Sequence, residues 1–272
     1  MDVSSVLTFL PQILQGCIVA SDAILSVYQS DFQKTLKADG SPVTEADLQS
    51  NEIITQVLAQ TNIPIIAEEN SKESYDVRAS WETVWLVDPL DGTKEFVKKN
   101  DEFVICIALI HQQKPVLGII ASPIQKEILV GGSLLKPSIV RFDAVHSPQK
   151  WIQISPKETL DEVVVISGSR SHQSGSELKF TNQLKSMFEK VHFQRKGSAL
   201  KFFDLALGHA DVYPRFAPTM EWDIAAGHAI IEALGGEVLH AEKETPLYYN
   251  KENLYNPYFV VQTKAYKKYI TS

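Results

Sequence analysis

Asp88 and Asp91 are the residues best suited to chemistry, because they set two carboxylates three positions apart on one short segment. Hard divalent cations such as Mg²⁺ need oxygen ligands that a rigid backbone holds in place. Residues 93–98 can begin a helix directly beyond the two acids, and free N–H groups at a helix start attract phosphate. The alternative is a solvated turn that merely caps this helix. For an isolated pair of acids that alternative would be favoured, so the rest of the chain has to decide.

The elements around this pair are predicted from residue type. Thr83–Val87 is a β-branched and aromatic run, which predicts a buried strand that ends on Asp88. Pro89 has no N–H to donate to a sheet, so we expect the strand to stop there. Gly92 then allows a tight bend into the helix. The two carboxylates should therefore lie on a rigid turn at the carboxyl end of a strand.

Further acids stand upstream, at the ends of other predicted elements. Ile63–Ala67 is predicted to be a short buried strand, and Glu68 and Glu69 follow it directly. Thr44 and Asp47 have capping-box spacing at the start of a predicted helix. From local sequence alone, Asp47 is best interpreted as supporting the dipole of that helix.

One more acid, Asp223, stands at the start of the predicted helix Glu221–Leu234, which ends at a Gly-Gly stop signal. Small residues in its next turns permit close approach of another backbone. A purely structural interpretation is that Asp223 caps the helix. That role is compatible with metal binding, because a carboxylate has lone pairs for both.

Composition limits the classes of function. The chain has 272 residues, is 44% hydrophobic and carries a net charge of −7, which argues against binding to a nucleic acid polymer or an anionic membrane. Cys17 and Cys106 lie in apolar runs without metal-ligand spacing, which predicts reduced core cysteines in a cytoplasmic protein. No stretch is expected to reach the length of a transmembrane helix, and Phe103–Ile110 is the longest clean apolar run. No Lys or Arg precedes Lys34, so no signal peptide is expected.

The order of predicted elements indicates an α+β protein. Val3–Tyr28 has the spacing of a helix with one apolar face, and a run of short strands occupies residues 102–142. A composition shift at Ala144–Lys150 is the best candidate boundary. Strands and helices alternate after it. We therefore expect an α+β half over residues 1–147, carrying Glu68, Asp88 and Asp91, and an α/β half over residues 148–272, carrying Asp223 and the substrate-binding residues.

Two segments carry a resemblance to a known family. Asp88-Pro89-Leu90-Asp91-Gly92-Thr93 and Trp222-Asp223-Ile224-Ala225-Ala226-Gly227, with Glu68-Glu69 upstream, resemble the signatures of the lithium-sensitive, Mg-dependent phosphatases of the inositol monophosphatase superfamily. Lys94-Glu95-Phe96 resembles the 3'(2'),5'-bisphosphate nucleotidases of the CysQ type within that superfamily. The resemblance implies a layered αβαβα sandwich with a metal site between its two halves. Departures occur at Ala67, Asp101, Val104 and Cys106, and they bear on substrate fit more than on chemistry.

The resemblance also implies roles for the acids. Asp88 bridges two Mg²⁺ ions, Glu68 and the Leu90 carbonyl complete one shell, and Asp91 and Asp223 complete the other. A third, weaker ion would use Glu68. Thr93 and Asp47 are similar to the pair that binds and deprotonates the attacking water. Glu69 would either assist the proton transfer without binding the metal ions itself or simply face solvent, and the sequence favours neither role.

For the substrate, the resemblance implies a small-molecule nucleoside bisphosphate. Its second phosphate must be bound by a positively charged side chain. Arg215 is suited to this, because a guanidinium can donate two parallel hydrogen bonds to phosphate oxygens. The full implied set of substrate contacts is Glu68, Asp91, Gly92, Thr93, His172, Ser198, Lys201, Arg215 and Asp223.

The function so implied is hydrolysis of 3'-phosphoadenosine 5'-phosphate to AMP and phosphate, in sulfur assimilation and nucleotide recycling. An inositol or other sugar monophosphatase is the alternative. A catalytically silent nucleotide-binding or metal-binding regulator is a third class, and the intact set of acids weighs against it. The superfamily often dimerises, but the sequence does not give the oligomeric state, so a homodimer is left open, as is weak peripheral attachment to the cytoplasmic side of the inner membrane.

Overall fold

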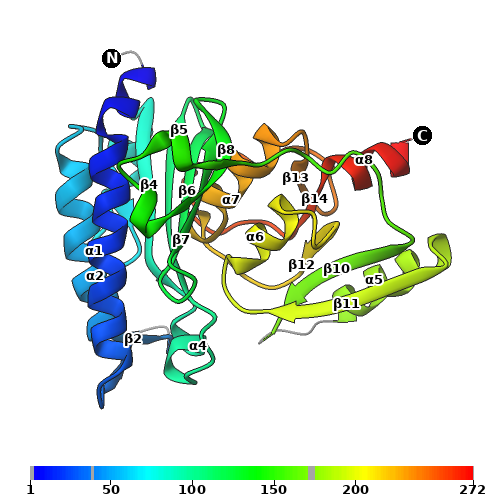
Figure 1. The fold of residues 1–272 in the computed structure, drawn as a ribbon, viewed down its shortest axis with the longest axis horizontal. Coiled ribbons are helices and arrows are strands. Elements are labelled where there is room, and N and C mark those ends of the chain that lie inside the picture. The colour runs from blue at the N-terminus through cyan, green and yellow to red at the C-terminus, as the bar shows by residue number, and fades with distance from the viewer. Residues whose placement is uncertain (1–2, 38–39, 171–174, 272) are drawn as a thin grey trace.

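Five alternating layers of helices and sheets make up the computed structural model, which describes residues 3–37, 40–170 and 175–271 (Figure 1). An outer helix layer covers a seven-stranded sheet, a central helix layer separates that sheet from a five-stranded sheet, and a last helix layer covers the far face. The helices of the three layers are, in that order, α1 (Leu10–Tyr28) and α2 (Glu45–Ala59); α6 (Leu200–Ala206) and α7 (Glu221–Ala233); and α5 (Gly175–Met187) and α8 (Lys264–Thr271). The prediction of an αβαβα sandwich is confirmed.

The seven-stranded sheet forms from neighbouring segments of the chain. Its strands, in spatial order, are β3 (Ile65–Ala67), β4 (Thr83–Asp91), β5 (Val104–His111), β6 (Lys114–Ser122), β7 (Glu127–Gly132), β8 (Leu135–Arg141) and β9 (Ile152–Gln153). Only β3 and β4 are parallel. Along β5, alternate residues belong to two different apolar clusters: Val104 and Cys106 face α7, whereas Ile105 and Ile107 face α1 and α2. Both faces are buried, which explains the unbroken apolar run.

The five-stranded sheet is mixed. Its spatial order is β11 (Lys190–Lys196), β10 (Val163–Ser169), β12 (Val212–Arg215), β14 (Phe259–Gln262) and β13 (Glu237–His240). β10 pairs in parallel with β11 and β12, while β14 pairs antiparallel with β12 and β13. The first sheet ends at residue 153 and the second begins at residue 163, although α7 also packs on the first sheet. The division of the chain into halves at residue 147 stays a prediction.

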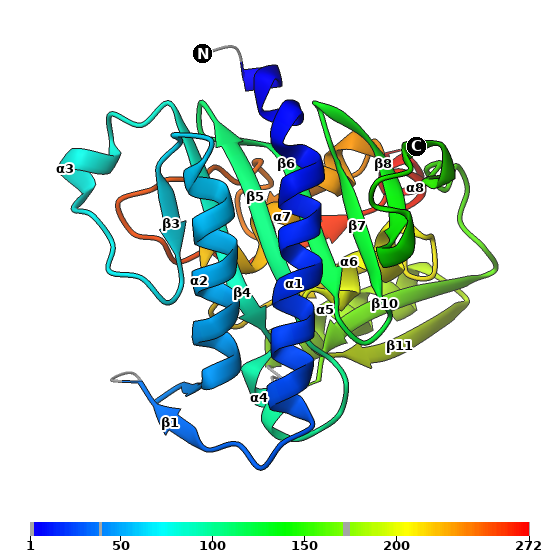
Figure 2. The same ribbon diagram turned by 60° about the vertical axis from the view of Figure 1, so that its left-hand side comes forward.

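The outer helix layer begins with a short 3₁₀ segment, η1 (Val3–Phe9), which continues into α1 with Pro11 in its first turn. Among the described residues, Val3–Tyr28 is the one helical segment long and apolar enough to cross a membrane by length and composition. The expectation that none would qualify is wrong, because a single charge, Asp22, interrupts an otherwise uncharged stretch. Here one face of α1 packs against α2 and the first sheet, as the apolar spacing predicted (Figure 2).

The central helix α7 lies extremely close to the first sheet. A Cβ atom on Gly118 of β6 would come within 2.0 Å of the Ala226 carbonyl oxygen of α7. On its other side, a Cβ on Gly227 would come within 2.2 Å of the Phe202 ring of α6. Neither position has room for a larger residue, so α7 is fixed between its neighbours on both sides.

One sequence expectation needs correction, and one open alternative is decided by the structure. β4 does not stop at Asp88 but continues through Pro89 to Asp91, because a bulge between Asp88 and Asp91 shifts the register against β5 and removes the need for a Pro89 N–H. The polar segment after α1, expected to be a loop or hairpin, forms an antiparallel hairpin of β1 (Lys34–Leu36) and β2 (Pro42–Thr44). Further elements had no predicted counterpart, among them α3 (Tyr75–Arg78), β9, β13, β14 and α8.

Candidate active site

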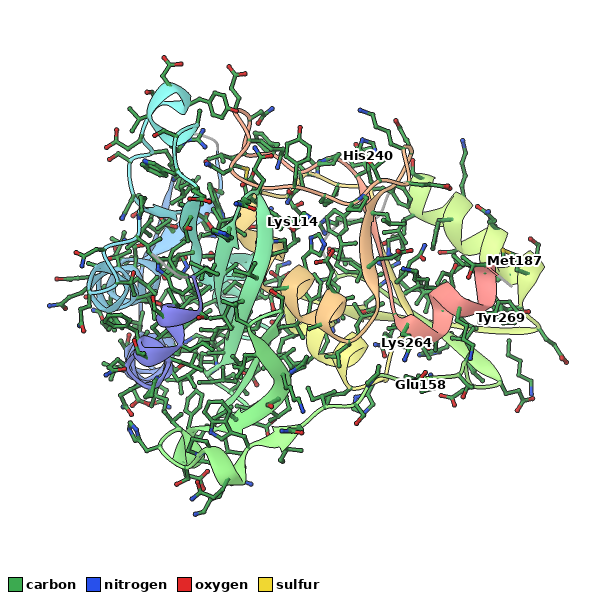
Figure 3. All side chains as sticks on the ribbon, turned by 90° about the horizontal axis from the view of Figure 1, so that it is seen from above. Lys114, Glu158, Met187, His240, Lys264 and Tyr269 are labelled. Atoms are coloured by element: carbon green, nitrogen blue, oxygen red, sulfur yellow. The ribbon has the colours of Figure 1, made fainter. Side chains whose placement is uncertain are left out.

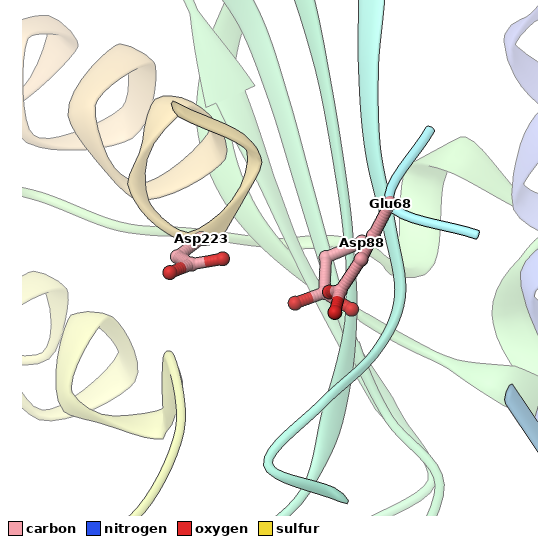
Figure 4. Close-up of side chains that lie close together, drawn as sticks. All are labelled: Glu68, Asp88 and Asp223. Carbon is pink, nitrogen blue, oxygen red and sulfur yellow. The ribbon is translucent and has the colours of Figure 1, made fainter. Parts of the chain in front are cut away.

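Three carboxylates from distant parts of the chain meet between the two sheets. Glu68 follows β3, Asp88 lies in β4, and Asp223 lies in the first turn of α7. One oxygen of each lies within 4.8 Å of the others. Figure 4 shows Glu68 and Asp88 side by side and Asp223 pointing toward them from the opposite element.

The local backbone explains why these side chains converge. The parallel pairing of β3 with β4 matches Ala67 with Val87, so the residues that follow, Glu68 and Asp88, lie side by side where β3 ends. The Asp88 Oδ1 atom accepts the Leu90 N–H at 2.9 Å, which fixes the carboxylate within the bulge. Asp223 accepts the Met220 N–H at 2.8 Å, as the capping interpretation expected, and its second oxygen remains for a ligand.

Burial and mutual repulsion raise the pKa values of Asp88 and Asp223. Desolvation, followed by the charges of Glu68, Asp91 and Asp223, raises the pKa of Asp88 well above its usual range. Desolvation, with the charges of Asp91 and Glu68, does the same to the pKa of Asp223. Such a cluster favours either protons or a cation that replaces them. Because all the donors are hard oxygens, the cluster fits a divalent cation such as Mg²⁺.

Asp91 lies at the end of β4 and lines the same pocket, but its carboxylate is outside the group of three. It accepts the backbone N–H of Ala199 from the second half of the chain. Desolvation raises the pKa of Asp91 to about 6, while the Lys201 charge opposes the shift. The nearby Leu90 carbonyl accepts a hydrogen bond from Thr93 Oγ1 at 3.3 Å. The metal-ligand roles of Asp91 and Leu90 stay predictions.

Asp47 combines the two roles that the sequence left open. Its Oδ2 atom accepts the Thr44 N–H at 2.8 Å and the Thr44 hydroxyl at 2.6 Å, which completes the predicted capping box of α2. Its Oδ1 atom accepts the Thr93 hydroxyl at 2.9 Å. Burial raises the pKa of Asp47, although these donors lower it in part. A residue that caps one helix thus also reaches the pocket through Thr93, which starts α4 (Thr93–Val97) behind Gly92 at φ 99°.

Lys37, at the turn of the β1–β2 hairpin, is a site residue that sequence reasoning missed. Its ammonium group lies 2.7 Å from Glu68 Oε1 and 2.5 Å from Glu69 Oε1. Desolvation lowers the pKa of Lys37, but these two ion pairs outweigh it and raise the pKa overall. Glu69 is therefore not a solvent-facing residue, since its side chain is only 7% exposed. No local pattern marks Lys37, because it acquires its role only when the hairpin folds over β3.

The opposite wall of the pocket is cationic. Lys201 is 4% exposed, lies over the Tyr213 ring at 5.1 Å and donates to the Ser198 carbonyl. Desolvation lowers its pKa to about 8. Arg215 donates from Nη2 to the Pro218 carbonyl at 3.2 Å, whereas its buried Nε has no hydrogen-bond partner among the described residues. The pocket between these cations and the acids has a volume of about 470 Å³. His172 lies outside the described residues.

Comparison with known proteins agrees with this architecture. The model of the inositol monophosphatase family matches residues 6–271. The 3'(2'),5'-bisphosphate nucleotidase CysQ of Salmonella typhimurium is 39% identical over 93% of this chain and 98% of its own, and that of Escherichia coli K12 is 38% identical over the same shares. The crystal structure of CysQ from Bacteroides thetaiotaomicron superposes with a TM-score of 0.83 at 38% identity, covering 97% of this chain and 98% of that one. The chain therefore belongs to the inositol monophosphatase family.

Proposed function

We propose that this chain is a Mg²⁺-dependent phosphatase that removes the 3'-phosphate of 3'-phosphoadenosine 5'-phosphate, giving AMP and phosphate. The observation that carries the proposal is one pocket with an acidic wall, from Glu68, Asp88 and Asp223, and a cationic wall, from Lys201 and Arg215. A substrate with two separated phosphates matches both walls. The relatives named as bisphosphate nucleotidases support this substrate class.

The acids provide a place for two cations, as the family resemblance implies. Asp88 offers an oxygen within 4.8 Å of both Glu68 and Asp223, and by resemblance to the family it would be the ligand that two ions share. Asp91 and the Leu90 carbonyl would complete the ligand set. When bound, such ions supply Lewis acidity, which makes a water nucleophilic and stabilises the leaving oxygen. The proposal keeps a third, weaker ion at Glu68.

Thr93 and Asp47 bind and deprotonate the attacking water. Because Thr93 Oγ1 donates its proton to Asp47 at 2.9 Å, its lone pairs are free to accept an O–H of the attacking water. As the water oxygen forms its bond to phosphorus, its proton moves to Thr93 and the hydroxyl proton moves to Asp47. The ester P–O bond breaks, and the departing sugar oxygen takes a proton from solvent. The raised pKa of Asp47 makes its carboxylate a better proton acceptor.

The phosphate that does not react would lie against the cationic wall. The buried Arg215 Nε without a partner is a donor available to a phosphate oxygen, and Lys201 adds a second charge. An inositol monophosphate has no group that would use both cations. This observation favours the bisphosphate over the alternative substrate.

A substrate panel tests the proposal. Phosphate release with Mg²⁺ is measured for the adenosine bisphosphate, inositol 1-phosphate and fructose 1,6-bisphosphate. We expect the adenosine bisphosphate to have the highest kcat/KM. A preference for inositol 1-phosphate would overturn the substrate assignment but leave the phosphatase chemistry in place.

The ligand role of Asp91 is tested separately. Asp91→Asn keeps an oxygen for the Ala199 N–H but removes the charge that a cation needs. We expect it to lose most turnover while the fold stays intact, with a metal-free Tm at neutral pH above that of the wild type because a buried charge is removed. Near-normal activity would remove Asp91 from the ligand set.

The cellular context is also part of the proposal. Cys17 and Cys106 are free and buried, which fits a reducing compartment, and we propose a cytoplasmic location. Homodimerisation and weak attachment to the inner membrane stay predictions.

A further inference from the structure

Glu102, just before β5, connects the first half of the chain to the second half through hydrogen bonds. Its carboxylate accepts two hydrogen bonds from the Arg170 guanidinium, from Nε at 2.7 Å and from Nη2 at 2.6 Å. The same carboxylate accepts the backbone N–H of Gly197 at 2.7 Å. Glu102 belongs to the chain segment after Asp91, whereas Arg170 and Gly197 follow β10 and β11. One side chain therefore joins two segments that line opposite sides of the pocket.

The segment 197–199 is held at very short range. A Cβ on Gly197 would lie 2.7 Å from Glu95 Cγ and 2.9 Å from Glu102 Oε2, so only glycine allows this approach. Ser198 adopts φ 49°, a left-handed conformation that few L residues adopt without support from their surroundings. Asp91 accepts the N–H of Ala199 on the far side of Ser198. Two carboxylates of the first half thus fix Ser198 from both sides.

Arg170 connects Glu102 to the second sheet. Its Nη2 also donates to the Arg195 carbonyl at 3.1 Å, and Arg195 Nη1 in turn donates to the Ser169 carbonyl at 3.0 Å. The carboxyl ends of β10 and β11 are therefore tied to each other and, through Glu102, to the first half. The Glu102 side chain is 16% exposed and that of Arg170 is 45% exposed, so the pair owes its rigidity to its two-pronged geometry and to the further hydrogen bonds of both partners rather than to burial.

The segment held in this way carries part of the cationic wall. Lys201 starts α6 only three residues after Ser198, and its ammonium group donates to the Ser198 and Lys196 carbonyls. A shift of residues 196–198 would displace that ammonium group. The Asp91 carboxylate would keep the Ala199 N–H, and the three clustered acids do not contact Glu102 or Arg170 in any described hydrogen bond.

We propose that Glu102 and Arg170 form a positioning pair that sets the distance between the metal-binding wall and the phosphate-binding wall, and thereby selects substrates with a second phosphate. The proposal rests on the proposed function, because it assigns that second phosphate to the cationic wall. Neither residue is assigned contact with the reacting atoms.

The test compares two ligands that differ only in the second phosphate. KM is measured for 3'-phosphoadenosine 5'-phosphate, and the inhibition constant of 3'-AMP is measured in the same assay. In Arg170→Ala we expect KM to rise about tenfold, with kcat within about threefold and the inhibition constant of 3'-AMP within about twofold of the wild type. Glu102→Gln, which keeps an acceptor for Gly197, should act in the same direction.

Two controls separate positioning from stability. Lys264→Ala removes a more exposed ion pair, 2.6 Å long, between the start of α8 and Glu158 (Figure 3), neither of which lines the pocket, and it should change neither constant. Because Glu102 and Arg170 act as one unit, the double variant should raise KM by no more than about the larger single effect.

The outcomes separate a failure of the proposed function from a failure of the positioning pair. If the wild type shows no preference for the bisphosphate, the proposed function fails and this inference fails with it. If the wild type prefers the bisphosphate but Arg170→Ala leaves KM unchanged, the positioning pair alone is refuted. Equal weakening of both ligands, or independent and additive effects of the two substitutions, would also refute it.

Discussion

Replacing one clustered acid should make the metal-free protein more stable while destroying its response to metal. Asp88→Asn is the most informative change, because Asp88 is 3% exposed and faces both Glu68 and Asp223. Asparagine has nearly the same shape and keeps the oxygen that accepts the Leu90 N–H. Its amide group can also donate to a neighbouring carboxylate. The substitution therefore removes repulsion without removing packing.

The size of the effect follows from the spacing. Two unit charges about 4.8 Å apart repel by roughly 3 kcal/mol at an effective dielectric constant near 20. The raised pKa of Asp88 means that part of this repulsion is already relieved by protonation. We therefore expect a gain in the free energy of unfolding of about 2 kcal/mol, or roughly 4–8 °C in Tm for a chain of this size.

The assay is thermal unfolding at pH 7.5 in EDTA and again in Mg²⁺. The wild type should gain Tm on adding Mg²⁺, because a ligand that binds only the folded state stabilises it. Asp88→Asn should start from a higher Tm in EDTA, gain little from Mg²⁺ and lose phosphatase activity. Asp211→Asn is the matched control: Asp211 is equally buried but paired with Lys157 at 2.9 Å and with the Val165 N–H at 2.8 Å, so its Tm should fall.

A lower Tm for Asp88→Asn in EDTA would refute the reasoning. It would mean that the Asp88 carboxylate contributes favourable interactions to the metal-free fold that outweigh its repulsion. A full Mg²⁺ response in the variant would separately refute the bridging role of Asp88.

Three further predictions follow from the same site. Thr93→Val should lower kcat by about 100-fold with a Tm close to that of the wild type, because it removes only the hydroxyl between Asp47 and the water; a wild-type kcat would exclude Thr93 from proton transfer. Arg215→Ala should raise KM for the bisphosphate with little change in kcat, and steady-state kinetics with an unchanged KM would place Arg215 outside the site. The pKa of Asp91 is about 6 in the folded state and about 3.9 in the unfolded state, so the folded state binds the Asp91 proton more tightly. Protonation of Asp91 therefore adds up to roughly 3 kcal/mol to the free energy of unfolding. This contribution is complete below pH ~4 and is lost as the pH rises through about 6. Tm in EDTA should therefore fall between pH 5 and 7 and fall less in saturating Mg²⁺, and a Tm in EDTA that rises over this interval would contradict the assignment.

Local chemistry was sufficient to predict the elements that carry the acids. The continuous run of β-branched and aromatic residues predicted β4, the capping box predicted the start of α2, and the Gly-Gly stop predicted the end of α7. Each depends on residues that are close in the sequence. The end of β4 was misjudged because a bulge, which satisfies Pro89, depends on pairing with β5 rather than on β4 itself.

The parts that could not be predicted depend on contacts across the fold. Lys37 is an ordinary polar residue until the hairpin brings it to Glu68, and Glu102 is ordinary until Arg170 and Gly197 reach it. β13 and β14 are short, and the pairing of β14 with β12 and of β13 with β14 supplies the regularity that their own sequence lacks. Composition also failed for Val3–Tyr28, because a buried core helix and a membrane-spanning helix have the same apolar content.

The tight contact of α7 with β6 has a consequence for anyone reading mutational data on this enzyme. A single added methyl group at Gly118 would have to push the Ala226 carbonyl away and so shift the whole of α7. The first turn of α7 holds Asp223, which would move with it. Loss of function at Gly118 or Gly227 would then look like a defect in cation affinity, although neither residue carries a ligand atom. Such variants should recover partly at high Mg²⁺ concentration, which a true ligand replacement would not do.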